Sequence, residues 1–185
     1  MTKKIAVFAD NGFEEIELLT PIDVLRRGGL EVDLISANNA DFVSSSRNVK
    51  ILVDKKINEI TSILDYDAIF VPGGMPGAEN LKNNDKIINF YQEMNESGKL
   101  VSAICAAPII LNRAGLTKDK NITCYPGFEK DMDFKSYSES TVVVDGNMIT
   151  GSGPGLALDF SLTLLAQLTD QETSDTIAKA MLHKK

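Results

Sequence analysis

The first 37 residues alternate two apolar runs with one amphipathic stretch, and this alternation restricts the fold more than any other feature. Lys4 to Ala9 and Leu30 to Ala37 are short apolar runs typical of buried strands. Between them, Phe13 to Arg27 places apolar residues at helical spacing with charged residues in between, and Gly28-Gly29 ends that helix. A strand, a helix and a strand at this spacing predict a βαβ unit, and therefore a parallel sheet with right-handed crossovers.

The same alternation continues to the end of the chain, so we predict one domain over residues 1–185, an α/β three-layer sandwich. Pro21 should bend or break the first helix, and Asn38 to Asn48 reads as a loop. Further strands are expected at 49–53, 66–71, 100–104, 121–124, 141–144 and 148–150, and helices at 57–64, 85–96, 109–114, 156–168 and 171–182.

Charge and composition exclude several classes of function. The net charge is −7, with no basic stripe to displace counterions, so nucleic acid is not an expected partner. The first apolar run is too short for a signal peptide or a membrane span, which predicts a cytoplasmic protein that does not bind membranes. Two cysteines in such a chain are expected to be free thiols.

Cys105 is the candidate nucleophile. It follows the apolar run Leu100 to Ile104 and precedes Ala-Ala-Pro and a helical pattern. At such a junction the sulfur lies near N–H groups that begin a helix, which should lower the thiol pKa and expose a reactive thiolate. The competing interpretation is an inert buried cysteine, which is the commonest state of a free thiol.

The base for this cysteine is expected to be a carboxylate. The only histidine, His183, stands three residues from the C-terminus, which disfavours a Cys–His–acid triad. Glu14, Glu15 and Glu17 begin the first helix, where acids also favour the helix dipole for purely structural reasons. Glu14 and Glu17 share a helix face. A carboxyl group near a thiolate in a dry pocket should have a raised pKa and titrate together with it.

Glycine-rich loops supply the remaining candidates. Gly73-Gly74 can be a simple turn, or it can direct N–H groups, together with that of Ala106, at a developing oxyanion. Gly151 to Gly155 lacks dinucleotide-binding spacing, no phosphate-loop motif is present, and no residue cluster suggests a metal. Because strand ends of a parallel sheet meet at one edge, these loops and Cys105 should converge there.

Taken together, these motifs resemble the ThiJ/PfpI superfamily, and more closely the branch that contains the Parkinson-disease deglycase protein. The resemblance covers almost the whole chain. It implies a flavodoxin-like fold, a homodimer, no cofactor, Cys105 as an oxidisable nucleophile, Glu17 as its carboxyl partner, and an anion pocket of Gly73, Gly74 and Ala106. The residues that carry it are Gly12 to Glu17, Pro21 to Gly28, Ser46-Arg47, Val71 to Gly74, Ala103 to Pro108 and Gly153 to Gly155.

Two positions depart from the pattern of that branch. Tyr125 stands where its better-known members often have a histidine, and Ser152 where others place an arginine. Tyr125 can line the substrate pocket and donate a hydrogen bond, but it is no base near neutral pH. Cys124, next to it, can approach Cys105 or be a small residue facing a core or subunit interface. Glu14, Arg47 and Cys124 are secondary candidates for residues of the site.

Two hypotheses for the function follow. The resemblance implies cofactor-independent processing of α-oxoaldehydes such as methylglyoxal and glyoxal, or removal of early glycation adducts, with Cys105 as nucleophile and Glu17 as acid and base. The alternative is a redox-responsive protein whose Cys105 is oxidised to sulfenic and sulfinic acid. Steady-state turnover of methylglyoxal would favour the enzyme, whereas selective dioxidation at stoichiometric peroxide without turnover would favour the sensor.

Overall fold

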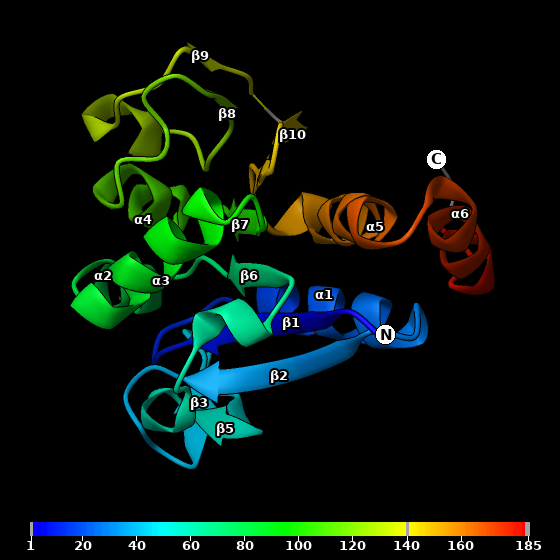
Figure 1. Ribbon diagram of the computed structural model, residues 1–185, viewed down its shortest axis with the longest axis horizontal. Helices are drawn as coiled ribbons and strands as arrows, with labels where there is room; N and C mark the ends of the chain where they lie inside the picture. The colour runs from blue at the N-terminus through cyan, green and yellow to red at the C-terminus, as the bar shows by residue number, and fades with distance from the viewer. Residues whose placement is uncertain (1, 140, 184–185) are drawn as a thin grey trace.

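A seven-stranded sheet forms the centre of the molecule, which we describe from a computed structural model covering residues 2–139 and 141–183. Its strand order is β10-β11-β7-β6-β1-β2-β5, and every neighbouring pair is parallel except β10 with β11 (Figure 1). This arrangement confirms the predicted α/β class with a mainly parallel sheet. The strands are β1 (Lys4–Ala9), β2 (Glu31–Ser36), β5 (Lys55–Lys56), β6 (Ala68–Val71), β7 (Leu100–Ile104), β10 (Val142–Asp145) and β11 (Met148–Gly151).

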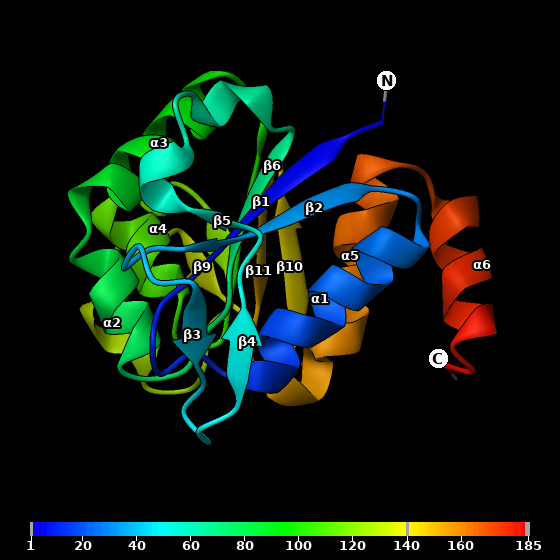
Figure 2. The same ribbon diagram turned by 90° about the horizontal axis from the view of Figure 1, so that it is seen from below.

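Helices cover both faces of this sheet, as Figure 2 shows. On one face α1 packs against α5, and α6 packs on the outer side of α5; α2, α3 and α4 cover the other face. Ring pairs join the sheet to both layers, because Phe8 of β1 meets Phe90 of α3 and Phe70 of β6 meets Phe160 of α5. The helices are α1 (Glu15–Arg27), α2 (Gly77–Lys82), α3 (Asp85–Glu96), α4 (Pro108–Arg113), α5 (Ala157–Leu168) and α6 (Gln171–Ala180).

The strongest sequence patterns correspond to the elements found. All four residues of β6 are buried, as expected for a strand covered on both faces. Side-chain oxygens of Glu14, Asn84 and Asp170 cap the first turns of α1, α3 and α6. The helix α1 continues through Pro21, so the prediction of a break at this residue was wrong.

Several short elements differ from the prediction. The helix expected at 57–64 is two 3₁₀ turns, η1 (Ile57–Glu59) and η2 (Ile63–Asp65), and the stretch read as a loop contains β3 (Phe42–Ser44). β3 pairs with β4 (Lys50–Leu52) in a separate hairpin. The helix α2 was not predicted. Other short elements are β8 (Asn121–Ile122), which pairs with β9 (Ser136–Tyr137), and the 3₁₀ turns η3 (Phe128–Asp131) and η4 (Pro154–Leu156).

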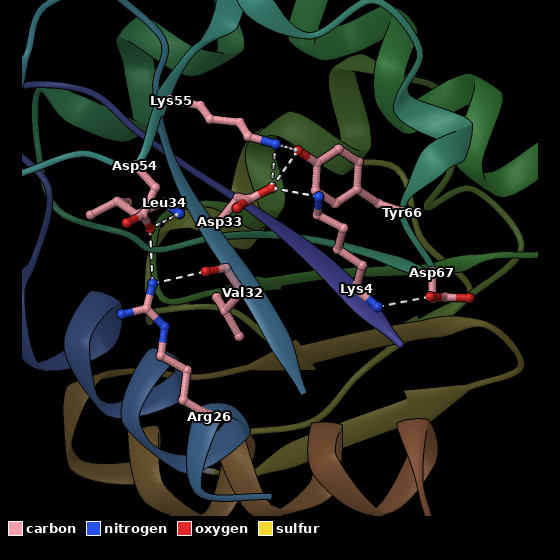
Figure 3. A network of polar contacts seen from close by, with 9 residues as sticks. All are labelled: Lys4, Arg26, Val32, Asp33, Leu34, Asp54, Lys55, Tyr66 and Asp67. Carbon is pink, nitrogen blue, oxygen red and sulfur yellow. Dashed lines mark hydrogen bonds and ion pairs between the residues drawn. The ribbon is translucent and has the colours of Figure 1, made fainter. Parts of the chain in front are cut away.

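A polar network ties the edge strand β5 to the sheet (Figure 3). Asp33 Oδ2 of β2 accepts from the Tyr66 hydroxyl at 2.8 Å and pairs with Lys55 Nζ at 2.8 Å and Lys4 Nζ at 3.1 Å. Both ammonium groups also stand over the Tyr66 ring. Burial opposes ionisation of Asp33, but hydrogen bonds from Lys55, Tyr66 and Lys4 outweigh it and lower the Asp33 pKa. The network therefore holds β5, a strand of only two residues, in place.

Candidate functional site

Cys105 occupies a tight turn at the carboxyl edge of the sheet. β7 ends at Ile104, and Cys105 follows with a positive φ of 64°, a left-handed conformation that costs a non-glycine residue roughly 1–2 kcal/mol. Two backbone hydrogen bonds hold the turn: the Cys105 N–H donates to the Gly151 carbonyl at 2.8 Å, and the Tyr125 N–H donates to the Cys105 carbonyl at 2.8 Å. The strained backbone is thus braced by two loops from the same sheet edge.

Glu17 directs its carboxyl group at this turn from the first turn of α1. The side chain is fully buried, and its Oε2 accepts the Gly73 N–H at 2.8 Å. Glu14, which caps α1, accepts the Glu17 N–H at 2.8 Å and thereby fixes the backbone from which the carboxyl projects. The carboxyl also lies within hydrogen-bonding reach of the Cys105 thiol. Cys105 and Glu17, predicted as partners from the sequence, are therefore neighbours.

Burial favours the protonated form of Glu17. It raises the pKa of Glu17 to about 7; the Glu14 charge adds to the rise, while hydrogen bonds from Cys105 and the Gly73 N–H oppose it. Oε1 is buried and receives no hydrogen bond of standard geometry from the described residues, which makes a negative charge there costly. Near neutral pH the Glu17 carboxyl is consequently present in both protonation states.

The expected lowering of the thiol pKa was wrong. Burial and the adjacent Glu17 carboxylate raise the pKa of the Cys105 thiol, and the N–H groups of Ala106 and Gly74 only partly offset them. Cys105 is 9% exposed, and α4 begins three residues later and has only six residues, so its dipole is short. The two groups are coupled: a thiolate is favoured only when Glu17 holds the proton.

Gly73 and Gly74 allow the backbone to approach both reacting groups. A Cβ at Gly73 would lie 2.7 Å from Cys105 Cβ and 2.7 Å from Glu17 Oε2. Gly74 has a positive φ of 88°, and a Cβ there would lie 2.3 Å from the Glu14 nitrogen. No side chain fits at either position. The N–H groups of Gly74 and Ala106 both face the sulfur, so together they can stabilise an anion formed there.

The side chains of Tyr125, Arg47 and Cys124 are not among the groups that interact with the Cys105 sulfur. Tyr125 is bonded to the Cys105 backbone, but its side chain is 48% exposed and stacks edge-on against Phe128. The exposed Arg47 guanidinium contacts its neighbour Ser46. Cys124 is a buried free thiol that burial holds at a pKa of about 12.

Neither His183 nor Ser152 is among the groups that interact with the Cys105 sulfur. His183 Nε2 lies 3.0 Å from Asp159 Oδ1 on α5, so this side chain is held at that helix. Ser152 is buried, and its N–H donates to the Thr141 carbonyl. The groups that face the thiol are one carboxyl and two backbone N–H groups.

Two hollows lie along this part of the molecule, and Tyr125 lines one of them. One, of about 410 Å³, lies over the loop from Ser152 to Leu156. The other, of about 630 Å³, is a groove between α2, α4 and η3. Pro126 lines both. The smaller hollow is lined by Tyr125 and the loop Gly153 to Gly155, which the sequence patterns had marked, whereas most residues of the groove come from segments without a motif.

The comparisons with known proteins agree with this geometry. Residues 3–167 match the DJ-1/PfpI family. The chain belongs to the DJ-1/PfpI family. Protein dj-1beta of Drosophila melanogaster is 33% identical over 184 residues, covering 98% of each chain, and an uncharacterised Methanocaldococcus jannaschii protein is 39% identical over 88% of this chain and 80% of its own.

Solved structures of family members superpose over nearly the whole chain. Drosophila DJ-1beta has a TM-score of 0.94 at 34% identity, and Toxoplasma gondii DJ-1, described as oxidized, has 0.94 at 33%; each covers 100% of both chains. A C103A mutant of a Salmonella typhimurium DJ-1 superfamily protein has 0.92 at 31%, also over 100% of both chains. These neighbours establish the DJ-1-like, flavodoxin-like fold for this chain.

Across 2–139 and 141–183, no helix has the length and apolar content that a bilayer crossing requires. Over the same residues, no three His, Cys, Asp or Glu side chains are grouped so that they could hold a metal ion.

Proposed function

We propose that this protein processes α-oxoaldehydes such as methylglyoxal and glyoxal, or their early adducts, without a cofactor. Cys105 is the nucleophile, and Glu17 is the acid and base. The observation that carries the proposal is the surroundings of the Cys105 sulfur, which interacts with the buried Glu17 carboxyl and with the N–H groups of Gly74 and Ala106. A nucleophile, a proton carrier and two oxyanion donors are thus gathered at one strand end.

The reaction begins when the thiol adds to the aldehyde carbon. A carbon–sulfur bond forms, the carbonyl oxygen becomes an alkoxide facing Gly74 and Ala106, and the thiol proton passes to Glu17 and then to that oxygen. The Glu17 carboxylate next takes the proton from the carbon that bears sulfur and returns it to the adjacent carbon, while the hydroxyl proton on the first carbon passes to the oxygen of the second, which leaves a thioester of a 2-hydroxy acid. Water cleaves the thioester and restores the thiol.

The balance needs no external oxidant, because one carbon is oxidised as its neighbour is reduced: methylglyoxal and water give lactate, and glyoxal and water give glycolate. A pKa of about 7 suits the role of Glu17, since both of its protonation states are populated at neutral pH. Removal of glycation adducts from thiols or amines would use the same nucleophile, so this arrangement supports either activity.

Cys105→Ser tests the proposal. We expect this variant to lose methylglyoxal consumption and lactate formation while it keeps the wild-type unfolding midpoint. Cys124→Ser is the matched control, because Cys124 is a free thiol that is not among the groups facing Cys105. Lactate formation that persists in Cys105→Ser would refute the nucleophile assignment.

A redox-responsive role is the second candidate, and the same two N–H donors favour it. The Cys105 thiolate would attack one oxygen of hydrogen peroxide and displace the other as hydroxide, giving sulfenic acid; a second equivalent would give sulfinic acid. Intact-mass analysis at stoichiometric peroxide tests this role. A gain of two oxygens at Cys105, with no turnover of methylglyoxal, would select the sensor over the enzyme.

We also propose that residues 1–185 form one domain that assembles as a homodimer. Apolar side chains stay exposed on α1 and on the neighbouring β3–β4 hairpin, including Ile16 and Leu52. Backbone hydrogen bonds from Gly12 and Ser46 join the hairpin to the start of α1, so these side chains belong to one region. Light scattering of the Leu52→Glu variant tests whether this region forms the dimer interface. We expect the variant to be monomeric, and a molar mass unchanged from that of the wild-type protein would exclude the hairpin from the interface. Action in the cytoplasm stays a prediction.

A further inference from the structure

The groove between α2, α4 and η3 has an apolar lining beside the reactive turn. Ile109 and Phe128 are partly buried there, Met132 is buried, and Pro126 continues the lining. Ile109 follows Cys105 by four residues, and the Phe128 ring contacts Tyr125, whose N–H is bonded to the Cys105 carbonyl. The groove therefore adjoins the turn that holds Cys105 without being formed by it.

Four charged side chains line the same groove, and two of them neutralise each other. Lys82 Nζ lies 3.0 and 3.1 Å from the two carboxylate oxygens of Glu79. The Arg113 guanidinium has only a long contact of 3.8 Å to Asp85, a side chain that is 89% exposed. Across residues 2–139 and 141–183, the Asp131 carboxylate takes part in no ion pair. One positive and one negative group thus remain available to a ligand.

We propose that this groove binds an amino acid with an apolar side chain. Arg113 pairs with its α-carboxylate, Asp131 pairs with its α-ammonium group, and the side chain packs on Ile109, Phe128 and Met132. A ligand with a single charge would leave either Arg113 or Asp131 without a partner, whereas a zwitterion matches both. This site goes beyond the proposed aldehyde chemistry and does not depend on it.

L-Norleucine is the probe, titrated into the Cys105→Ser protein so that no chemistry at the sulfur contributes. Backbone amide chemical shifts should change at Ile109, Phe128 and Met132. Norleucine amide lacks the carboxylate and N-acetyl-norleucine lacks the ammonium group, so each should bind about two- to fivefold more weakly, as expected for one solvent-exposed ion pair. Equal affinity of the three ligands, or no saturable shift change in the groove, would overturn the proposal.

Two variants test which side chain pairs with which charged group of the ligand. Arg113→Gln should abolish the preference for norleucine over its amide and keep the preference over the N-acetyl derivative, and Asp131→Asn should do the reverse. Arg113→Lys should restore part of the lost preference. Arg27→Gln, an exposed arginine on α1, is the matched control and should keep both preferences. A preference that survives in all variants would refute the assignment. Because the three ligands are also compared on unchanged Arg113 and Asp131, misfolding of a variant leaves the test decisive.

Discussion

Replacing Glu17 with glutamine tests the electrostatic state of the site through the stability of the protein. The wild-type carboxyl has a pKa of about 7 in the folded protein and an ordinary value of 4.5. A raised acid pKa contributes stability that is fully present below the unfolded pKa and is lost as pH rises through the folded one. Wild type should therefore lose stability between about pH 4.5 and pH 7, and the Glu17 contribution should be constant above that range.

The difference between the folded and the ordinary pKa of Glu17 sets the size of the expected stability difference. At about 1.4 kcal/mol per pKa unit, the rise from 4.5 to about 7 corresponds to about 3 kcal/mol. Glutamine has nearly the shape of a protonated glutamate, and its oxygen can accept the Gly73 N–H, so the variant should match wild type at acid pH. It should become about 3 kcal/mol more stable than wild type by about pH 8. The raised thiol pKa of Cys105 leaves this range free of other contributions from the pair.

Urea unfolding of both proteins from about pH 4 to about pH 8 measures the difference, since groups that do not interact with Glu17 contribute equally to both proteins and cancel. Glu93→Gln, on the exposed side of α3, is unfolded under the same conditions as the matched control for exchanging a carboxyl group for an amide. If the Glu17→Gln difference is constant across the range, the Glu17 carboxyl is not held in a charge-disfavouring pocket, and its assignment as a proton carrier is refuted.

Two further predictions concern the backbone and the sheet edge. Gly73→Ala should cost about 1–3 kcal/mol of stability and slow alkylation of Cys105 by iodoacetamide roughly tenfold or more, because the added methyl lies 2.7 Å from both Cys105 Cβ and Glu17 Oε2. Gly155→Ala, where a Cβ meets no atom within 4 Å, is its control, and equal alkylation rates would contradict the packing argument. Asp33→Asn should destabilise the protein by about 1–2 kcal/mol near neutral pH, because Lys4, Lys55 and Tyr66 lose their shared anion. Since the Asp33 pKa is lowered, the stability that its carboxylate contributes is lost as pH falls through that pKa, so unfolding midpoints that differ equally at acid and neutral pH would refute this.

Elements with a complete local signal were predictable from the sequence. β1 and α3 have the predicted bounds, because an uninterrupted apolar run and a capped amphipathic pattern each specify one state. The helix α2 has no such signal: its six residues follow a proline- and glycine-rich loop, and packing against α4 stabilises it. Residues 57–64 have apolar residues at helical spacing but form only single 3₁₀ turns. Tertiary contacts decide such short segments.

The members of the site could be predicted for a topological reason, but their pKa values could not. Strand ends of a parallel sheet meet at one edge, so Cys105 and the loop of Gly73 and Gly74 had to converge, with α1 starting beside them. Desolvation depends on the side chains packed around a group, and no local pattern records it. The nearby N–H groups favour the thiolate, as predicted, but burial dominates both pKa values.

This dominance of burial changes how a thiolate can form at Cys105. A helix tip that lowered the thiol pKa would keep the sulfur ionised permanently, and that charge would hold Glu17 in its protonated form, so no proton would pass between the two groups. With both pKa values raised, the pair holds at most one charge near neutral pH, and sulfur gains it only when its proton moves to Glu17. The step that activates the nucleophile therefore also produces the acid that the new alkoxide requires. Removing the Glu17 carboxyl should consequently impair both the formation of the thiolate and the protonation that follows, so their effects on rate cannot be separated into independent contributions.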